Sequence, residues 1–69
     1  MKPEVFFGIN AGKVWEILKK NKKDLGAKSI AKETKLSIEE VYGALGWLGR
    51  EGKIEVINRG RAKTFKLLE

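Results

Sequence analysis

The clearest hydrophobic pattern in the chain lies between residues 37 and 50, where apolar side chains recur every three or four positions. This spacing is typical of a helix with one buried face. Ser37 and Glu40 form a capping-box pair at its start, and Gly52 supplies a C-terminal glycine after it. The pattern therefore predicts a helix that begins after Ser37 and ends near Arg50. Its expected core face consists of Ile38, Val41, Ala44, Leu45 and Leu48.

Two further helices are predicted upstream. The first runs from about residue 11 to residue 21, with Asn10 as its N-cap, so that the apolar segment 5–9 stays outside it. Leu25-Gly26 then breaks the helical pattern, and a short helix is expected from about residue 27 to residue 34. The expected inward side chains of these two helices are Val14, Ile17, Leu18, Ile30 and Ala31.

After Gly52 the apolar residues adopt the two-residue period of strands. Residues 54–58 alternate imperfectly, and residues 62–67 place Phe65 and Leu67 on one face. Between them lies Asn58-Arg59-Gly60-Arg61, a turn in which Gly60 can adopt a positive φ. A short helix, a tight turn, a longer helix and a hairpin follow one another in a winged helix-turn-helix. We therefore predict a mainly α fold with three helices, a C-terminal wing and a short extra strand near Leu25.

Composition excludes most kinds of chemistry. The chain has 69 residues, which suits one domain over residues 1–69. It has no Cys and no His, so disulfides, thiol nucleophiles, imidazole bases and the usual zinc ligand sets are absent. The acidic residues lack the paired arrangement of a hydrolase. No catalytic residue, cofactor or metal site is predicted, and we do not expect an enzyme.

The chain shows no signal for a membrane or for export. No apolar run approaches the roughly 18 residues that a spanning helix requires. The first residues, Met1-Lys2-Pro3-Glu4, lack the basic region and apolar core of a signal peptide. We therefore expect a cytoplasmic protein with no membrane partner, and no small-molecule ligand is implied.

The net charge of +6 favours a polyanionic partner. Residues 1–36 carry nine lysines against four acidic residues, a balance of +5, whereas residues 37–57 carry −2 and residues 58–69 carry +3. We predict binding to double-stranded DNA, mainly through its phosphates. The alternative is that these cations are ordinary solvated surface charges. The candidate contacts are Lys28, Lys32 and Lys35 around the second helix and Arg59, Arg61 and Lys63 on the wing.

The outward face of the third helix is poorly suited to reading base edges. Major-groove readout favours Arg, Lys, Asn, Gln, Ser or Thr, but the first turn of this helix offers Glu39 and Glu40. Gly43, Gly46 and Gly49 follow, and each costs a helix about 0.8–1 kcal/mol relative to Ala. Close approach by the backbone of another element is therefore expected on this face.

That element could belong to a partner or to the same chain. In the first reading the face is a homodimer or protein interface without sequence-specific DNA binding, and an exposed Trp is a typical interface anchor. In the second reading Trp47 and Tyr42 cover the wing or the N-terminal segment of their own subunit. The candidate interface residues are Tyr42, Gly43, Gly46, Trp47 and Arg50.

Several short stretches together resemble a known family. They are Asn10-Ala11-Gly12-Lys13-Val14-Trp15, Leu36-Ser37, Glu40-Val41-Tyr42, Ala44-Leu45-Gly46-Trp47-Leu48 and Arg50-Glu51-Gly52-Lys53-Ile54. Over most of its length the chain resembles a family of small standalone winged helix-turn-helix proteins whose function is unassigned. The resemblance implies the fold and a dimer, but no ligand. More distant winged-helix transcription regulators have a similar layout, and the departure from them at Glu39, Glu40 and Gly43 argues against base-specific recognition.

Overall fold

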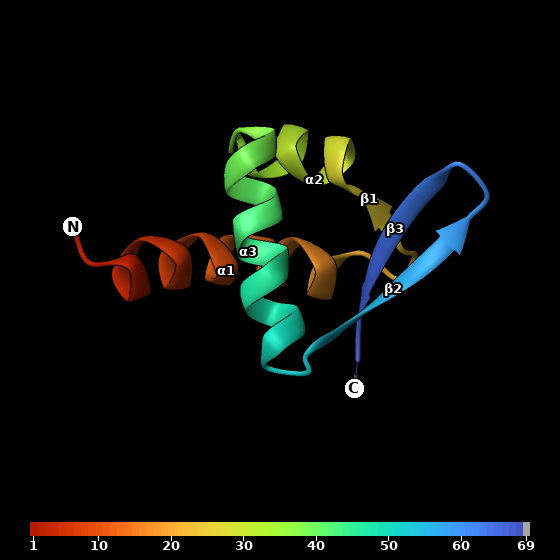
Figure 1. The fold of residues 1–69 in the computed structure, drawn as a ribbon. Helices are drawn as coiled ribbons and strands as arrows, with labels where there is room; N and C mark the ends of the chain where they lie inside the picture. Colours follow the sequence, from red (N-terminus) through yellow and green to blue (C-terminus); the bar gives the residue numbers. More distant parts are fainter. Residues whose placement is uncertain (69) are drawn as a thin grey trace.

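Three helices and a three-stranded antiparallel sheet make up the computed structural model, which describes residues 1–68 (Figure 1). The helices are α1 (Pro3–Lys20), α2 (Ala27–Thr34) and α3 (Ile38–Arg50). The strands are β1 (Leu25–Gly26), β2 (Ile54–Arg59) and β3 (Ala62–Leu67), with β3 in the middle of the sheet. This architecture confirms the predicted winged helix, including the short strand at Leu25.

The start of α1 differs from the prediction. The helix begins at Pro3, so the apolar segment 5–9 is helical and Asn10 lies inside the helix rather than capping it. Pro3 occupies the first turn, where its fixed φ suits a helix and its missing amide hydrogen is not needed. The predicted N-cap was wrong because this proline signal lies further upstream. Asn10 is instead 5% exposed, and its side-chain Nδ2 has no hydrogen-bond partner.

Local signals set the limits of α3 as predicted. The Ser37 hydroxyl accepts a hydrogen bond from the Glu40 amide (3.1 Å), and the Glu40 carboxylate accepts one from the Ser37 amide (2.9 Å). This capping box satisfies two amides at the start of the helix. After Arg50 the chain turns at Gly52, whose φ of +72° is readily adopted only by glycine.

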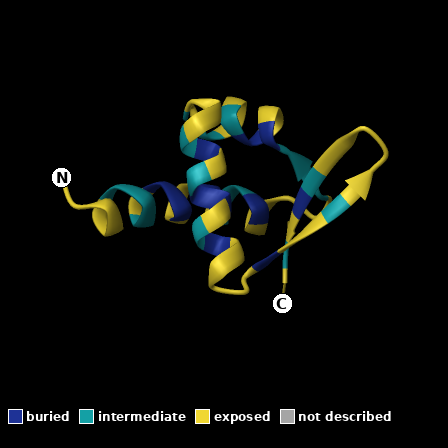
Figure 2. Cartoon of the chain, in the orientation of Figure 1, coloured by how far each residue is buried: buried dark blue, intermediate teal, exposed yellow. Residues whose placement is uncertain are grey.

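The core lies where the three helices meet the sheet (Figure 2). The stripe predicted for α3 is buried except at its first residue, Ile38, which is 40% exposed. Ile38 is the first residue of α3 and therefore lies at the N-terminal end of the stripe. Ile17 of α1 and Ala31 of α2 are half-buried. The buried apolar residues are Ala11, Val14, Leu18, Ala27, Ile30, Val41, Ala44, Leu45, Leu48, Ile54 and Phe65.

The wing projects from this core as a hairpin of β2 and β3 (Figure 1). Its strands pair from Ile54 opposite Leu67 to Arg59 opposite Ala62. The connecting turn contains Gly60, whose φ is +74° as expected from the sequence. Within residues 1–68, no helix has the length and hydropathy to cross a membrane, and no three acidic side chains are grouped as metal ligands.

Candidate nucleic-acid interface

A groove of about 540 Å³ lies between the start of α2 and the wing. It brings together three of the six predicted DNA contacts: Lys28 from α2, and Arg61 and Lys63 from the wing. All three side chains are exposed. We call this hollow the basic groove. Its lining residues are Gly26, Ala27, Lys28, Ser29, Tyr42, Arg61, Ala62, Lys63 and Phe65.

The two-residue strand β1 holds the two sides of the basic groove together. Gly26 pairs with Thr64 of β3, and α2 begins at the next residue. The start of α2 is thereby fixed beside the wing. A Cβ on Gly26 would lie 3.8 Å from the Lys63 carbonyl oxygen, an ordinary contact.

The start of α2 also favours an anion. Its N-cap residue, Gly26, has no side chain to accept from the first amides, and the first turn contains no acidic residue. The free amides and the positive end of the helix dipole therefore add to the charge of Lys28. The cations of the wing face the same hollow. The basic groove is suited to a phosphate backbone.

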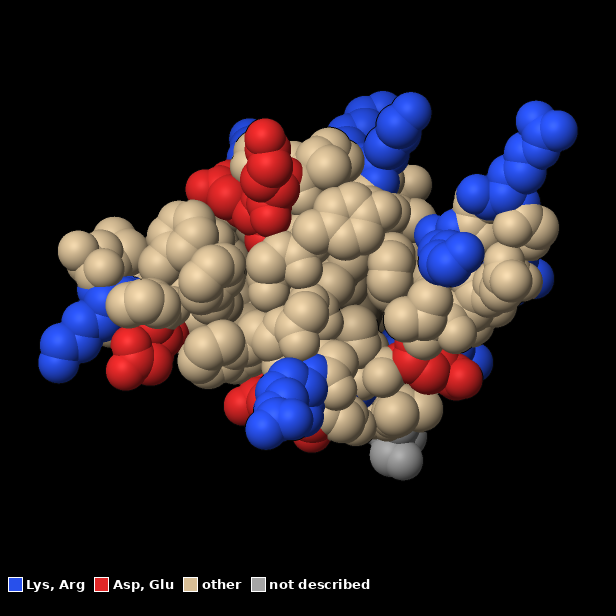
Figure 3. Space-filling view, viewed as in Figure 1, with Lys and Arg blue, Asp and Glu red and all other residues tan. Residues whose placement is uncertain are grey.

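Surface charges of the two signs lie over different elements. Figure 3 shows lysine and arginine side chains over α2 and the hairpin, acidic side chains at the start of α3, and a broad uncharged area over α3 itself. Lys32 and Lys35 are exposed but lie further along α2, outside the lining of the basic groove. Lys35 is the C-cap of that helix and has a left-handed backbone, with φ of 65°.

Arg59, the sixth predicted contact, is engaged with a carboxylate. Its Nε and Nη2 atoms donate hydrogen bonds to the two oxygens of Asp24, at 3.0 and 2.8 Å. The Asp24 side chain, which is 14% exposed, also accepts a hydrogen bond from the Thr64 hydroxyl. The hydrogen bonds from Arg59, and to a smaller extent the one from Thr64, hold the pKa of Asp24 well below its usual range. The geometry gives Arg59 a bracing role near the tip of the wing, where it ties the end of β2 to the loop between α1 and β1.

Sequence reasoning gave Asp24 no role. The residue follows a run of lysines, and its partners Arg59 and Thr64 lie 35 and 40 positions away. No local pattern marks such a pair, since only the fold brings the α1–β1 loop next to the wing.

The residues predicted as a protein interface have different surroundings. Tyr42 is 54% exposed, and its ring lies edge-to-face with Phe65 of the wing, at 6.3 Å and 85°. Gly43 lies against Phe7, because a Cβ there would be 2.7 Å from the Phe7 Cε1 atom. A Cβ on Gly46 would have nothing within 4 Å. The structure thus places a neighbour of the same chain against Gly43, while Gly46 faces open space.

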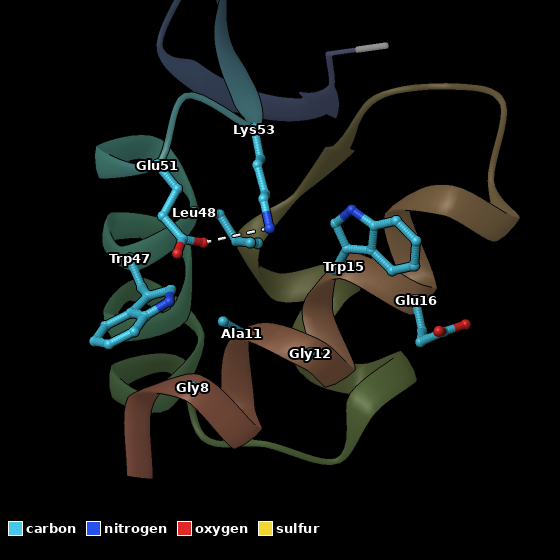
Figure 4. A pocket seen from close by; sticks show the side chains of 9 residues that line it. All are labelled: Gly8, Ala11, Gly12, Trp15, Glu16, Trp47, Leu48, Glu51 and Lys53. Atoms are coloured by element: carbon cyan, nitrogen blue, oxygen red, sulfur yellow. Dashed lines mark ion pairs between the residues drawn. The ribbon is translucent and has the colours of Figure 1, made fainter. Parts of the chain in front are cut away.

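The last two of those residues, Trp47 and Arg50, also differ from each other. Arg50 is exposed, whereas Trp47 is half-buried and packs against the core. Trp47 also faces a hollow of about 460 Å³ between α1 and α3, with Trp15 on the opposite side (Figure 4). At its rim Lys53 and Glu51 form an exposed ion pair of 3.6 Å, a type that contributes little to stability.

The chain is similar to known winged helix-turn-helix proteins. Residues 1–67 match the family model described as "Winged helix-turn-helix domain (DUF2582)". The solution NMR structure of protein BT2368 from Bacteroides thetaiotaomicron superimposes with a TM-score of 0.89. Its sequence is 29% identical, and the similarity covers 96% of this chain and 79% of that chain. No curated protein sequence matches the chain.

Proposed function

Because the chain belongs to the winged helix-turn-helix domain family DUF2582, we propose that it is a nucleic-acid-binding module with no catalytic activity, in the manner of a DNA-binding regulator. The observation that carries the proposal is the convergence of Lys28, Arg61 and Lys63 on the basic groove. Three cations around one hollow, next to an uncapped helix start, are complementary to a phosphate backbone.

The same geometry argues against α3 as a reader of base edges. Its first turn carries Glu39 and Glu40. The Glu40 carboxylate is held in the capping box, so its negative charge is fixed at the end of the helix that would enter a major groove. Binding is therefore assigned to the wing and α2. With about three phosphates neutralised, log Kobs should fall against log salt with a slope of roughly −3 on a duplex.

Fluorescence anisotropy with a labelled DNA oligomer tests this proposal. Removing two groove charges in Arg61→Ala/Lys63→Ala should weaken binding on the order of tenfold at about 0.1 M salt and reduce the slope by about 2. The matched control is Lys13→Ala/Lys20→Ala, which removes two exposed charges from α1. Its affinity should stay within about threefold, because neither lysine lines the basic groove and the charge of an exposed side chain outside it is screened by salt. Equal weakening by both variants, or no binding at low salt, would contradict the proposal.

A second function, self-association through α3, is favoured by an apolar hollow of about 300 Å³ between α3 and the wing. Two open glycines of α3, Gly46 and Gly49, line it together with exposed Val56 and Tyr42. Small residues beside exposed apolar groups allow another backbone to approach closely.

Sedimentation velocity tests this second function. If the chain associates through this hollow, Gly46→Leu should yield a folded monomer. Gly12→Leu provides the control, because Gly12 is also an exposed helical glycine with open space around it and lies outside the hollow. A monomeric wild type, or an assembly that survives Gly46→Leu, would refute self-association through this face.

A further inference from the structure

We infer that the basic groove takes a nucleic acid with unpaired bases, and that Tyr42 stacks on one of them. The inference rests on the proposed nucleic-acid binding and specifies the strand state of the ligand. Its starting point is that an exposed aromatic ring and three cations line one hollow. Grooves that bind single strands combine these two elements: cations that follow the backbone and aromatic rings that hold the bases.

The exposed strip of α3 beside the groove is apolar. Ile38 and Tyr42 are one helical turn apart and therefore neighbours on the helix surface. They are 40% and 54% exposed. The next position along this strip is Gly46, which has no side chain. A duplex presents its bases edge-on, and apart from the thymine methyl group these edges are read by donors and acceptors. The Tyr42 hydroxyl is the one such side-chain group that these three residues offer. The strip instead matches the apolar faces of bases, which are accessible in a single strand.

Tyr42 is anchored but not covered. Its ring contacts Phe65, which is 6% exposed and belongs to the central strand β3. The edge-to-face contact fixes the tyrosine relative to the wing. More than half of Tyr42 remains exposed at 54%, so a base can stack on the ring without any rearrangement of the core.

The charges around α3 point to the same ligand. To enter a major groove, α3 would have to bring Glu39 and Glu40 between two phosphate backbones. A single strand can lie along Lys28, Arg61 and Lys63 without meeting a second backbone, in a groove whose lining contains neither of these two carboxylates. The acidic start of α3 therefore disfavours an intact duplex more strongly than a single strand.

The test compares four fluorescent probes of equal length: a DNA strand, its blunt duplex, a strand of abasic sugar-phosphate, and the RNA strand of the same sequence. The wild type should bind the DNA strand at least fivefold more tightly than the duplex or the abasic strand, because neither of those two probes offers free base faces. The RNA strand shows whether the site distinguishes ribose from deoxyribose. A lower affinity for RNA than for DNA would restrict the ligand to single-stranded DNA.

Two variants isolate the ring. Tyr42→Leu should lose roughly fivefold or more of its affinity for the DNA strand while its affinities for the duplex and the abasic strand change less than about twofold. Tyr42→Phe keeps the ring and should bind like the wild type, provided that both variants retain the wild-type circular dichroism spectrum. Equal losses on all probes, no loss on the DNA strand, or a preference for the duplex would overturn the stacking of Tyr42. The proposed function would survive those results as long as Arg61→Ala/Lys63→Ala still weakens binding, whereas no binding of any probe would refute both.

Discussion

The three glycines of α3 lie in two kinds of surroundings, so the same Gly→Ala substitution at each of them tests the packing of α1 on α3. A Cβ on Gly43 would lie 2.7 and 3.0 Å from the Phe7 Cε1 and Cδ1 atoms, whereas a Cβ on Gly46 or Gly49 would have nothing within 4 Å. The position of Phe7 follows from the unexpected extension of α1 to Pro3. Gly→Ala substitutions in α3 therefore report on the N-terminal part of α1.

The expected magnitudes follow from two opposing effects. In a helix interior, Ala is about 0.8–1 kcal/mol more favourable than Gly. Gly46→Ala should gain close to this amount, and Gly49→Ala somewhat less because it lies in the last turn. At Gly43 the gain is offset by overpacking of about 1–3 kcal/mol against Phe7, so Gly43→Ala should be neutral or destabilising by up to about 2 kcal/mol. For a domain of this size, about 1 kcal/mol shifts the Tm by about 4–8 °C.

Thermal and urea denaturation followed by circular dichroism measure these differences. Gly46→Ala should raise the Tm, and Gly43→Ala should leave it unchanged or lower it. In a Phe7→Ala background the ring that a Cβ at position 43 would meet is absent, so Gly43→Ala should become stabilising. The coupling free energy between the two substitutions should be about 1–3 kcal/mol. A Gly43→Ala variant as stabilised as Gly46→Ala, with no coupling to Phe7, would refute the packing of Phe7 over α3.

Two further predictions concern the brace of the wing and the cap of α3. Since the folded state holds the pKa of Asp24 below its usual value of about 3.9, the stabilisation is present above that pH and is lost as the pH falls through the folded pKa. Chemical denaturation should show that the difference in unfolding free energy between wild type and Asp24→Asn becomes smaller on acidification. A difference that stays constant with pH would contradict the bracing role of the Arg59–Asp24 pair. Removing the hydroxyl of the capping box in Ser37→Ala should cost about 1 kcal/mol, and thermal denaturation should show no comparable loss for Ser29→Ala, an exposed serine of α2. Equal stabilities of wild type and Ser37→Ala would argue against the cap.

The sequence was informative where the signals are local. The Ser37–Glu40 box, Gly52 and the Gly60 turn each act within a few residues, and the structure confirms all three. The start of α1 was missed because a plausible cap at Asn10 competed with Pro3, and neither local signal shows that Phe7 packs against α3. The sequence predicted that the backbone of another element approaches the glycines of α3. Within the described chain the approaching group is the Phe7 side chain, and it reaches only Gly43, while Gly46 and Gly49 have nothing within 4 Å.

The sequence predicts the candidate site only in part, for a different reason. The cations of the basic groove were identified from charge alone, but their grouping depends on β1 pairing with β3. The pairing of Arg59 with Asp24 joins residues 35 positions apart. Sequence reasoning treated Arg59 and Arg61 alike, as exposed cations of one turn. The fold separates them, with Arg59 bound to a carboxylate and Arg61 facing the groove.

An amide NMR titration with a DNA strand and with its duplex, each at low and high salt, tests the central claim most directly. Binding in the basic groove should shift the amides of residues 26–29, 42 and 61–65, and the shifts should fade as salt rises. The shift at Tyr42 should be larger with the single strand. The absence of shifts at low salt, or shifts confined to the hollow between Trp15 and Trp47, would contradict nucleic-acid binding at this groove.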